Sequence, residues 1–158
     1  MNETAFDELL KGLAEAGAEF VLIGGLALNA WGVVRGTKDV DVVVAKNEGN
    51  LKRVAAVAVA AGGHVQRAES LTGSELGIAA LLASDEQVVI ETRFGKLDVV
   101  GGLDGVPSYI ELRKRAVEAE VLGVSVWVCS RDDLRRMKSA AGRTRDLADL
   151  EDLEASGG

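Results

Sequence analysis

Two acidic residues inside an otherwise apolar segment constrain the fold of this chain more than any other feature. Residues 39–45 alternate Asp and Val and then become wholly apolar, a pattern typical of a strand whose beginning faces something polar. An earlier apolar run, residues 19–23, ends at Gly24-Gly25, and thirteen residues separate Gly25 from Asp39. Because residues 26–31 suit a short helix, the order is strand, glycine turn, helix, strand. This order predicts a sheet with helices packed on it.

Periodic segments elsewhere predict further helices and strands. The expected helices cover residues 4–16, 48–61 with Asn47 as N-cap, 107–118, 130–142 and 143–154, and the expected strands cover residues 88–94, 96–100, 120–122 and 124–129. Residues 63–84 give no clear pattern beyond a candidate strand at 64–68, so their type stays open. The sum is a mixed α/β or α+β fold.

Length and composition favour one folded domain over residues 1–158, with the helices at about 130–154 packed on its core. The chain is 47% hydrophobic and 27% charged, which is ordinary for a globular protein, and it has no Pro-rich or Ser-rich linker. Its 18 Lys and Arg against 25 Asp and Glu give a net charge of -7. That balance argues against a broad binding surface for duplex nucleic acid.

The first residues of the chain, and its single Cys and His, argue against a secreted protein, a membrane protein and a zinc protein. Residues 1–4 are polar and acidic where a signal peptide is basic and then apolar, and no apolar run reaches about 18 residues, so we expect a cytoplasmic protein without membrane contact. Cys129 and His64 are single, which leaves no cluster for zinc. Any metal must therefore be held by carboxylates.

Three acids are the candidate metal ligands. Asp39 and Asp41 stand two apart on a strand, so both side chains point to one face, roughly 6 to 7 Å apart along the backbone. Asp98, alone among apolar strand residues, is the candidate third carboxylate, with a solvent-facing role as its alternative and Glu91 as the next candidate. Oxygen ligands suit Mg²⁺ or Mn²⁺, and three acids permit two metals.

A candidate phosphate site accompanies the acids. Gly24 and Gly25 would let backbone N–H groups approach an anion at the beginning of a helix. Arg35 and Lys138 are candidate partners of the phosphates, although surface ion pairs are the alternative for both. Asp146 and Asp149 receive no catalytic role, because spacing of three on a helix suits surface pairs with Arg143 and Arg145. Dinucleotide, P-loop and serine-hydrolase motifs are not found in the sequence.

These residues resemble the nucleotidyltransferase superfamily that includes DNA polymerase beta. In that superfamily a strand leads to a glycine pair, then to Asp-hydrophobic-Asp-hydrophobic, with a third acid on a later strand; Gly24, Gly25, Asp39, Asp41 and Asp98 fill these positions. The run 35–41, Arg-Gly-Thr-Lys-Asp-Val-Asp, is similar to a variant in small bacterial nucleotidyltransferases of the toxin-antitoxin and abortive-infection groups. A later motif around Met137-Lys138, Gly142-Arg143, Asp146 and Asp149 has a counterpart there too.

The resemblance implies a mixed β-sheet nucleotidyltransferase core flanked by helices. It also implies transfer of a nucleoside monophosphate from a nucleoside triphosphate to an acceptor, with Asp39, Asp41 and Asp98 as catalytic metal ligands and Gly24, Gly25, Arg35 and Lys138 as nucleotide-binding residues. The acceptor stays open among RNA, protein and small molecule, since the chain has no room for a separate substrate-binding helical domain. The alternative is a catalytically silent binding or regulatory relative, for example a toxin-antitoxin component. A homodimer or a cognate protein partner is compatible with both.

Overall fold

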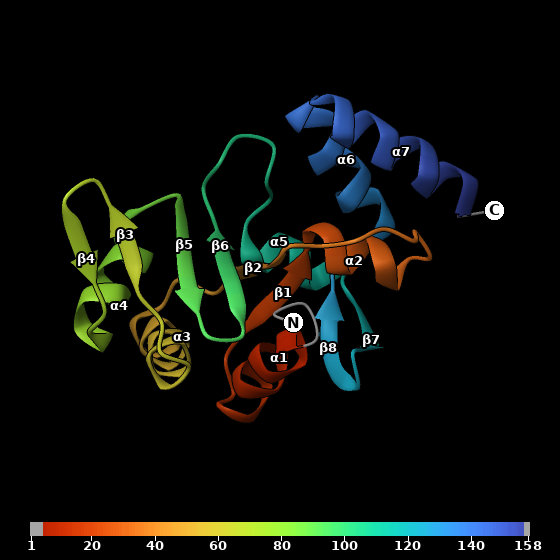
Figure 1. Ribbon diagram of the computed structural model, residues 1–158. Coiled ribbons are helices and arrows are strands. Elements are labelled where there is room, and N and C mark those ends of the chain that lie inside the picture. Colours follow the sequence, from red (N-terminus) through yellow and green to blue (C-terminus); the bar gives the residue numbers. More distant parts are fainter. Residues whose placement is uncertain (1–4, 157–158) are drawn as a thin grey trace.

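The computed structural model describes residues 5–156 of the chain as a mixed sheet with helices on both faces (Figure 1). In chain order the elements are α1 (Phe6–Glu15), β1 (Phe20–Ile23), α2 (Gly24–Ala30), β2 (Asp39–Val44), α3 (Glu48–Ala60), β3 (Val65–Arg67), β4 (Ser70–Thr72), α4 (Glu75–Ser84), β5 (Gln87–Thr92), β6 (Gly95–Val100), α5 (Tyr109–Arg115), β7 (Val117–Val121), β8 (Val124–Val128), α6 (Arg131–Ala141) and α7 (Thr144–Ser156). The expected mixed α+β class is confirmed. No helix within residues 5–156 has the length and apolar character that a membrane span needs.

Six strands form the main sheet in the order β5-β6-β2-β1-β8-β7. The pairs β2–β6 and β1–β8 are parallel, while β1–β2, β5–β6 and β7–β8 are antiparallel. Hairpins therefore form both edges, and the two central strands β1 and β2 each pair with a strand from much later in the chain. β3 and β4 make a separate small sheet.

The register of the central strands sets the place of the acids. In the parallel pair, Asp39 lies opposite Lys96 and Asp41 lies opposite Asp98. In the antiparallel pair, Ile23 at the end of β1 also lies opposite Asp41. Because residues opposite one another in a sheet project to the same face, the end of β1 and the acids of β2 and β6 meet on one face.

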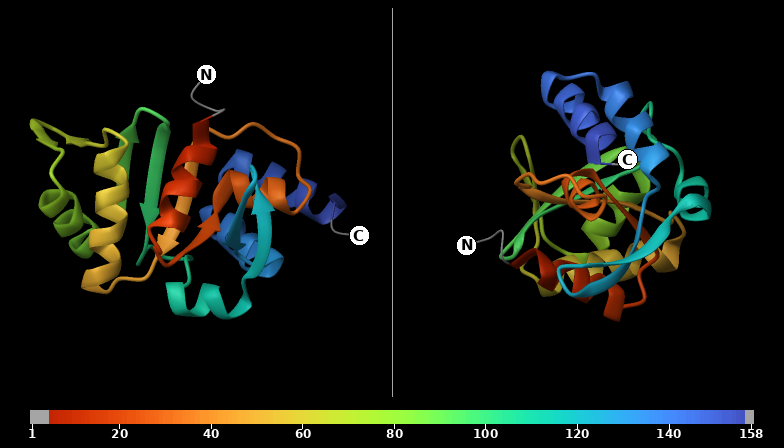
Figure 2. Two further views of the ribbon diagram at one scale, coloured as in Figure 1. Left: turned by 90° about the horizontal axis from the view of Figure 1, so that it is seen from below. Right: turned by 90° about the vertical axis from the view of Figure 1, so that its right-hand side faces the viewer.

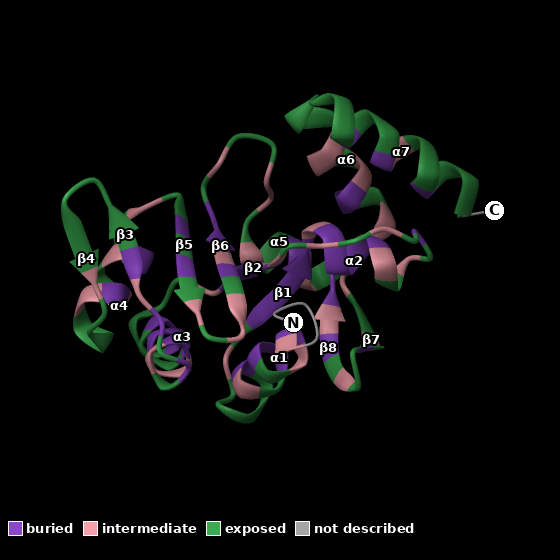
Figure 3. Ribbon diagram, viewed as in Figure 1, coloured by how far each residue is buried: buried purple, intermediate pink, exposed green. Residues whose placement is uncertain are grey.

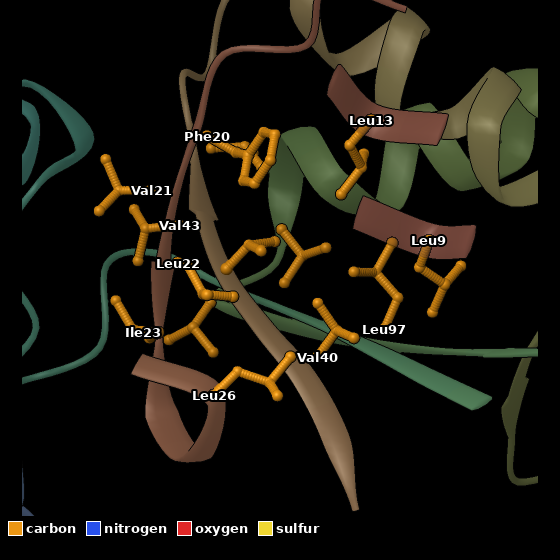
Figure 4. Packing of buried hydrophobic residues seen from close by; sticks show 14 of the residues in the cluster. Leu9, Leu13, Phe20, Val21, Leu22, Ile23, Leu26, Val40, Val43 and Leu97 are labelled. Carbon is orange, nitrogen blue, oxygen red and sulfur yellow. The ribbon is translucent and has the colours of Figure 1, made fainter. Parts of the chain in front are cut away.

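Helices α1 and α3 cover the other face of the sheet, where most of the core lies. Figure 2 shows these two helices and the pair α6 and α7 on opposite sides of the strands. Leu9 and Leu13 of α1 pack with Phe20, Val40 and Leu97 of the sheet, all of them buried (Figure 4). The sheet is therefore anchored by its apolar face, while the acid face is only partly covered, by α2, α6 and α7 (Figure 3).

Most helix ends and strands agree with the sequence predictions. Asn47 caps α3 by accepting a hydrogen bond from the backbone N–H of Asn50 at 2.9 Å, as expected. The beginning of the first helix, predicted at Thr4, lies outside the described residues. Residues 75–84, left open above, form α4, capped by Ser74. No period marked this helix because apolar residues occur on all its sides: Ile78 and Leu82 are buried, but Leu76 is exposed.

The helix and the hairpin predicted around residue 117 are present, but their bounds were wrong. The helix predicted over 107–118 begins only at Tyr109, because Ser108 makes a reciprocal capping box with Glu111, and it ends at Arg115. The predicted strand 120–122 is β7, which begins at Val117, because Val117 pairs with Val128 of β8. Pairing within the β7–β8 hairpin here overrides the local helical pattern.

Asn50 is a fully buried polar residue that ties α3 to the ends of β1 and β2. Its Oδ1 accepts a hydrogen bond from the backbone N–H of Glu19 at 2.7 Å. Its Nδ2 donates to the carbonyls of Glu19 at 3.0 Å and Ala45 at 2.8 Å. One side chain thus satisfies three backbone groups beside the central strands.

We expect Asn50→Ala to lower the free energy of unfolding by about 3 kcal/mol, because it removes three hydrogen bonds, each worth about 1 kcal/mol, between a fully buried side chain and part-buried backbone groups. Urea denaturation of the two proteins measures the difference. The control is Lys52→Ala on the same helix, whose ion pair with Glu48 is exposed, and which should stay within about 0.5 kcal/mol of wild type. Equal effects of the two substitutions would contradict the role of Asn50.

Candidate active site

Asp39, Asp41 and Asp98 converge on the acid face, as their spacing predicted. Each offers a carboxylate oxygen, and these oxygens lie within 4.8 Å of one another. All three residues are half-buried. Glu91, the alternative third acid, is exposed and lies opposite Lys96 at the far end of the β5–β6 hairpin, outside this cluster. The structure therefore brings together the three acids that the sequence singled out.

Gln87 also contacts this cluster, although no sequence pattern predicted it. Its Nε2 donates to both carboxylate oxygens of Asp98, at 3.1 Å and 2.9 Å. Gln87 begins β5 and lies opposite Val100, so it is the diagonal neighbour of Asp98 across the hairpin. Only the register of the hairpin reveals this, since a lone Gln at the beginning of a strand carries no signal.

Ionisation of two carboxyl groups of the cluster, those of Asp41 and Asp98, is disfavoured. Burial, and then repulsion from Asp98 and Asp39, raise the pKa of Asp41 to about 7, although Lys138 and a hydrogen bond from the backbone of Gly25 oppose the rise. Burial and the charge of Asp39 likewise raise the pKa of Asp98, against the hydrogen bonds from Gln87 and Asp41. A cation at the cluster would offset both effects.

Gly24 and Gly25 leave room for neighbouring side chains. Gly24 has φ +69°, and a Cβ there would meet the Cγ of Asp41 at 2.8 Å. A Cβ on Gly25 would meet the Oγ1 of Thr37 at 2.6 Å. The glycine pair thus lets Asp41 and the 31–38 loop approach the beginning of α2. Its predicted contact with phosphate stays a prediction.

The acids form the floor of a cleft with a volume of about 510 Å³. Both basic and apolar side chains line it, and the basic ones are called the basic wall below. The basic residues are Arg35, Lys38, Lys138, Arg143 and Arg145, and the apolar ones include Val100, Val106, Leu134, Met137 and Ala141. The basic residues come from the 31–38 loop, from α6 and α7, and from the turn between these two helices. An acidic protein therefore has a locally basic wall beside its acid cluster.

The expectation that Asp146 and Asp149 lie on a helix surface was wrong, although Asp146 does pair with Arg143 as expected. Both are buried, on the side of α7 that faces α6. Asp146 binds Arg143, with Oδ2 at 2.6 Å from Nε, and its Oδ1 lies 3.2 Å from Lys138 Nζ. Asp149 Oδ2 lies 3.1 Å from Lys138 Nζ and 2.5 Å from Arg35 Nη1. Arg35 and Lys138 therefore lie at the cleft, but in contact with these buried acids.

The acid cluster fits a hard divalent cation. Its donors are three carboxylates, the oxygen ligands that Mg²⁺ and Mn²⁺ prefer, and the raised pKa values show an unmet demand for positive charge. Asp39, Asp41 and Asp98 are the residues that could hold such an ion. Its identity is part of the proposal below.

Comparison with solved structures shows which fold carries this site. The antibiotic-resistance factor ANT(2'')-Ia superposes with a TM-score of 0.68 at 17% identity, over 98% of this chain and 83% of that one. The lincosamide antibiotic adenylyltransferase LnuA superposes with a TM-score of 0.66 at 10% identity, over 98% and 97%. The chain has the nucleotidyltransferase fold. An antigenic nucleotidyltransferase-like protein from Paracoccidioides brasiliensis also matches, with a TM-score of 0.58 at 14% identity, over 98% and 75%.

The nucleotidyltransferase fold is thus reached through structure, since no protein-family model matches the sequence and no curated protein matches it. The sequence resemblance to this superfamily is borne out by the structural matches. What they share with this chain is the arrangement of the backbone. The chemistry of the site is therefore argued from its own residues.

The raised pKa of Asp41 predicts a pH-dependent gain in stability for Asp41→Asn in metal-free protein. The pKa of Asp41 is about 7 in the folded chain and lower in the unfolded chain. The wild-type protein therefore loses stability as the pH rises from the lower value to about 7, whereas an Asn side chain does not titrate. We expect the stability of Asp41→Asn relative to wild type to increase by about 2 to 3 kcal/mol from pH 5 to pH 8.

Urea denaturation with a chelator at both pH values measures this difference. The control is Asp104→Asn, which removes an exposed carboxylate in the loop between β6 and α5. It should show no such increase. A stability difference for Asp41→Asn that stays constant or shrinks between pH 5 and pH 8 would contradict the burial and repulsion assigned to Asp41.

Proposed function

We propose that the protein is a metal-dependent nucleotidyltransferase that moves a nucleoside monophosphate from a nucleoside triphosphate to a hydroxyl-bearing acceptor. The observation that carries the proposal is the acid cluster of Asp39, Asp41 and Asp98 at the floor of a cleft with a basic wall. The nucleotidyltransferase fold supports the same reaction class. Residues 1–158 are taken as a single domain of this type.

The three acids would hold Mg²⁺ or Mn²⁺. When bound, the ion supplies positive charge to the phosphates and to the attacking oxygen. Asp39 and Asp41, two residues apart on β2, would hold the ion beside the phosphates. Asp98, held by Gln87, orients the acceptor hydroxyl and receives its proton.

The transfer itself is a displacement at the α-phosphorus. The acceptor oxygen forms a new P–O bond, the bond from the α-phosphorus to the bridging oxygen breaks, and pyrophosphate leaves with the electron pair. Arg35 and Lys138 at the basic wall would bind the phosphates that leave, together with the backbone at Gly24 and Gly25. Lys138 also lowers the pKa of Asp41, which indicates that its charge reaches the acid cluster.

The similar structures indicate which acceptors to try first. One structure of ANT(2'')-Ia contains adenylyl-2''-tobramycin, and the LnuA structure contains lincomycin. Both neighbours thus bind small molecules of antibiotic type. RNA and protein are also candidate acceptors for this chain. Duplex DNA is disfavoured as an acceptor by the net charge of -7. A nucleoside triphosphate substrate supports the expected cytoplasmic location.

The direct test is transfer of label from α-³²P nucleoside triphosphates in the presence of Mg²⁺ or Mn²⁺. The acceptors are an aminoglycoside, a lincosamide, total RNA and a cell extract, each in a separate reaction. Labelled product together with pyrophosphate is the expected result. Binding of nucleotide without any transfer would instead identify a catalytically silent relative, such as one component of a toxin-antitoxin pair.

We expect a nucleoside triphosphate and Mg²⁺ together to raise the melting temperature by more than the sum of their separate effects, because the phosphates complete the coordination of the ion. Asp39→Asn, which removes one carboxylate at nearly constant volume, should abolish this synergy. Differential scanning fluorimetry with each of the four nucleotides measures it. Additive effects in the wild-type protein would count against a shared metal-nucleotide site.

We expect Asp98→Asn to lose transfer by at least about a hundredfold while it keeps most of its affinity for nucleotide, because Asp98 acts on the acceptor oxygen. Paired turnover and calorimetric assays separate the two effects. Glu91→Gln, the same change of charge on the neighbouring strand β5, is the control and should transfer normally. Normal transfer by Asp98→Asn would remove Asp98 from the mechanism. Gly25→Val is a poor probe, since its side chain would collide with Thr37.

A further inference from the structure

Helix α7 turns two acids, besides the apolar Leu153, toward the rest of the protein. Its buried residues are Asp146, Asp149 and Leu153, at helical spacing on one side. A buried carboxylate usually costs more than an apolar residue of similar size, even when it is paired. The two acids are therefore poor candidates for stabilising the packing of α7 on α6, and their contacts point to another role.

Asp149 connects two segments that both reach the cleft. Its Oδ2 lies 2.5 Å from Arg35 Nη1 in the 31–38 loop and 3.1 Å from Lys138 Nζ on α6. Arg35 and Lys138 line the cleft, whereas Asp149 lies behind them and is 5% exposed. Asp149 can therefore affect a ligand only through these two cations.

The ion pairs with the buried acids leave one donor group of each cation free for the cleft. Arg35 donates through Nε to the carbonyl of Gly36 and through Nη1 to Asp149, and within residues 5–156 its Nη2 has no hydrogen-bond partner. Lys138 Nζ binds Asp146 and Asp149, which leaves one of its three N–H groups for the cleft. Both free donors can then turn to a phosphate oxygen without a change of the ion pairs.

The loop that carries Arg35 is fixed at its backbone by other residues. Asn29 Nδ2 donates to the carbonyls of Val33 at 2.8 Å and Arg35 at 3.1 Å. Thr37 Oγ1 donates to the carbonyl of Asp39 at 3.0 Å. The contact with Asp149, 114 residues later in the chain, therefore orients the Arg35 side chain on a loop that is already placed.

Asp146 and Asp149 differ in what they hold. Asp146 accepts three hydrogen bonds from Arg143, one from the backbone and two from the guanidinium, besides its contact with Lys138. It mainly stabilises the turn between α6 and α7. Within the part of the chain that the structure describes, Asp149 alone joins a cation of the 31–38 loop, Arg35, to a cation of α6, Lys138.

We propose that Asp149 is a positioning residue that holds Arg35 and Lys138 toward the triphosphate of the substrate. The proposal rests on the nucleotidyltransferase function proposed above and assigns α7 a part in it. Removal of Asp149 should weaken binding of the phosphates of the ligand. It should leave binding of a metal by the acid cluster unchanged.

The test compares Asp149→Asn with Asp152→Asn. Both remove one negative charge from α7, but Asp152 is exposed to solvent one turn further along the helix. Calorimetry measures affinity for Mg·ATP, for Mg·tripolyphosphate and for Mg²⁺ alone. We expect Asp149→Asn to weaken binding of both phosphate ligands by about tenfold and of Mg²⁺ alone by less than twofold, with Asp152→Asn at wild-type values.

A double-mutant cycle with Arg35→Met separates positioning from a general loss of stability. In the Arg35→Met background, Asp149→Asn should weaken binding by about threefold or less, because half of what it positions is gone. Hydrogen exchange gives a second readout that needs no ligand: the amides of residues 33–37 should keep wild-type rates in Asp149→Asn, since Asn29 and Thr37 hold that backbone.

The outcomes decide between the two proposals. Wild-type affinity for Mg·tripolyphosphate in Asp149→Asn, or a tenfold loss that persists in the Arg35→Met background, overturns the positioning role. If wild-type protein binds neither Mg·ATP nor Mg·tripolyphosphate, the proposed function fails, and the positioning role with it. Should Asp149→Asn not fold, Asp149→Glu replaces it; this variant keeps the charge but displaces the carboxylate, and wild-type affinity there overturns the role as well.

Discussion

The parallel pairing of β2 with β6 is the constraint on which the site depends. It sets Asp41 opposite Asp98, although the two are 57 positions apart in the sequence, and Ile23 at the end of β1 lies opposite Asp41 as well. The apolar sides of these strands are buried against α1 and α3, so a slip of one residue would turn the acids into the core and the valines into the cleft. The hydrophobic core thus fixes the position of the charges on the other face.

Holding three carboxylates together works against stability, and the surrounding residues show how the fold limits the cost. Gln87 donates to Asp98, the backbone of Gly25 donates to Asp41, and Lys138 adds positive charge nearby. None of these contacts neutralises the cluster, since the pKa of Asp41 stays near 7. Such stored repulsion is typical of sites that bind a cation or move a proton. The acid cluster and the basic wall are therefore complementary parts of one site.

Much of this could be predicted from the sequence because the signals were local. Alternation of Asp and Val marks a strand with one polar end, and Asn47 and Ser130 mark helix beginnings, all of which the structure contains. The glycine pair was predicted as a turn before a helix, whereas the structure has it as the first two residues of α2. The bounds around Val117 were wrong because pairing with β8 decided them, and α4 was left open because apolar residues occur on all its sides.

By itself, the sequence determined the pair Asp39 and Asp41, the face of the strand on which both lie, Asp98 and Glu91 as candidates for a third acid, and the presence of basic residues near the C-terminal end. Each of these follows from spacing along one element. Only the tertiary structure decided that Asp98 rather than Glu91 joins the pair, that Gln87 holds it, and that Asp146 and Asp149 are buried against cations of the cleft. Those contacts join elements whose register and packing are set by the whole core, and no local pattern encodes which charged residues will be brought together.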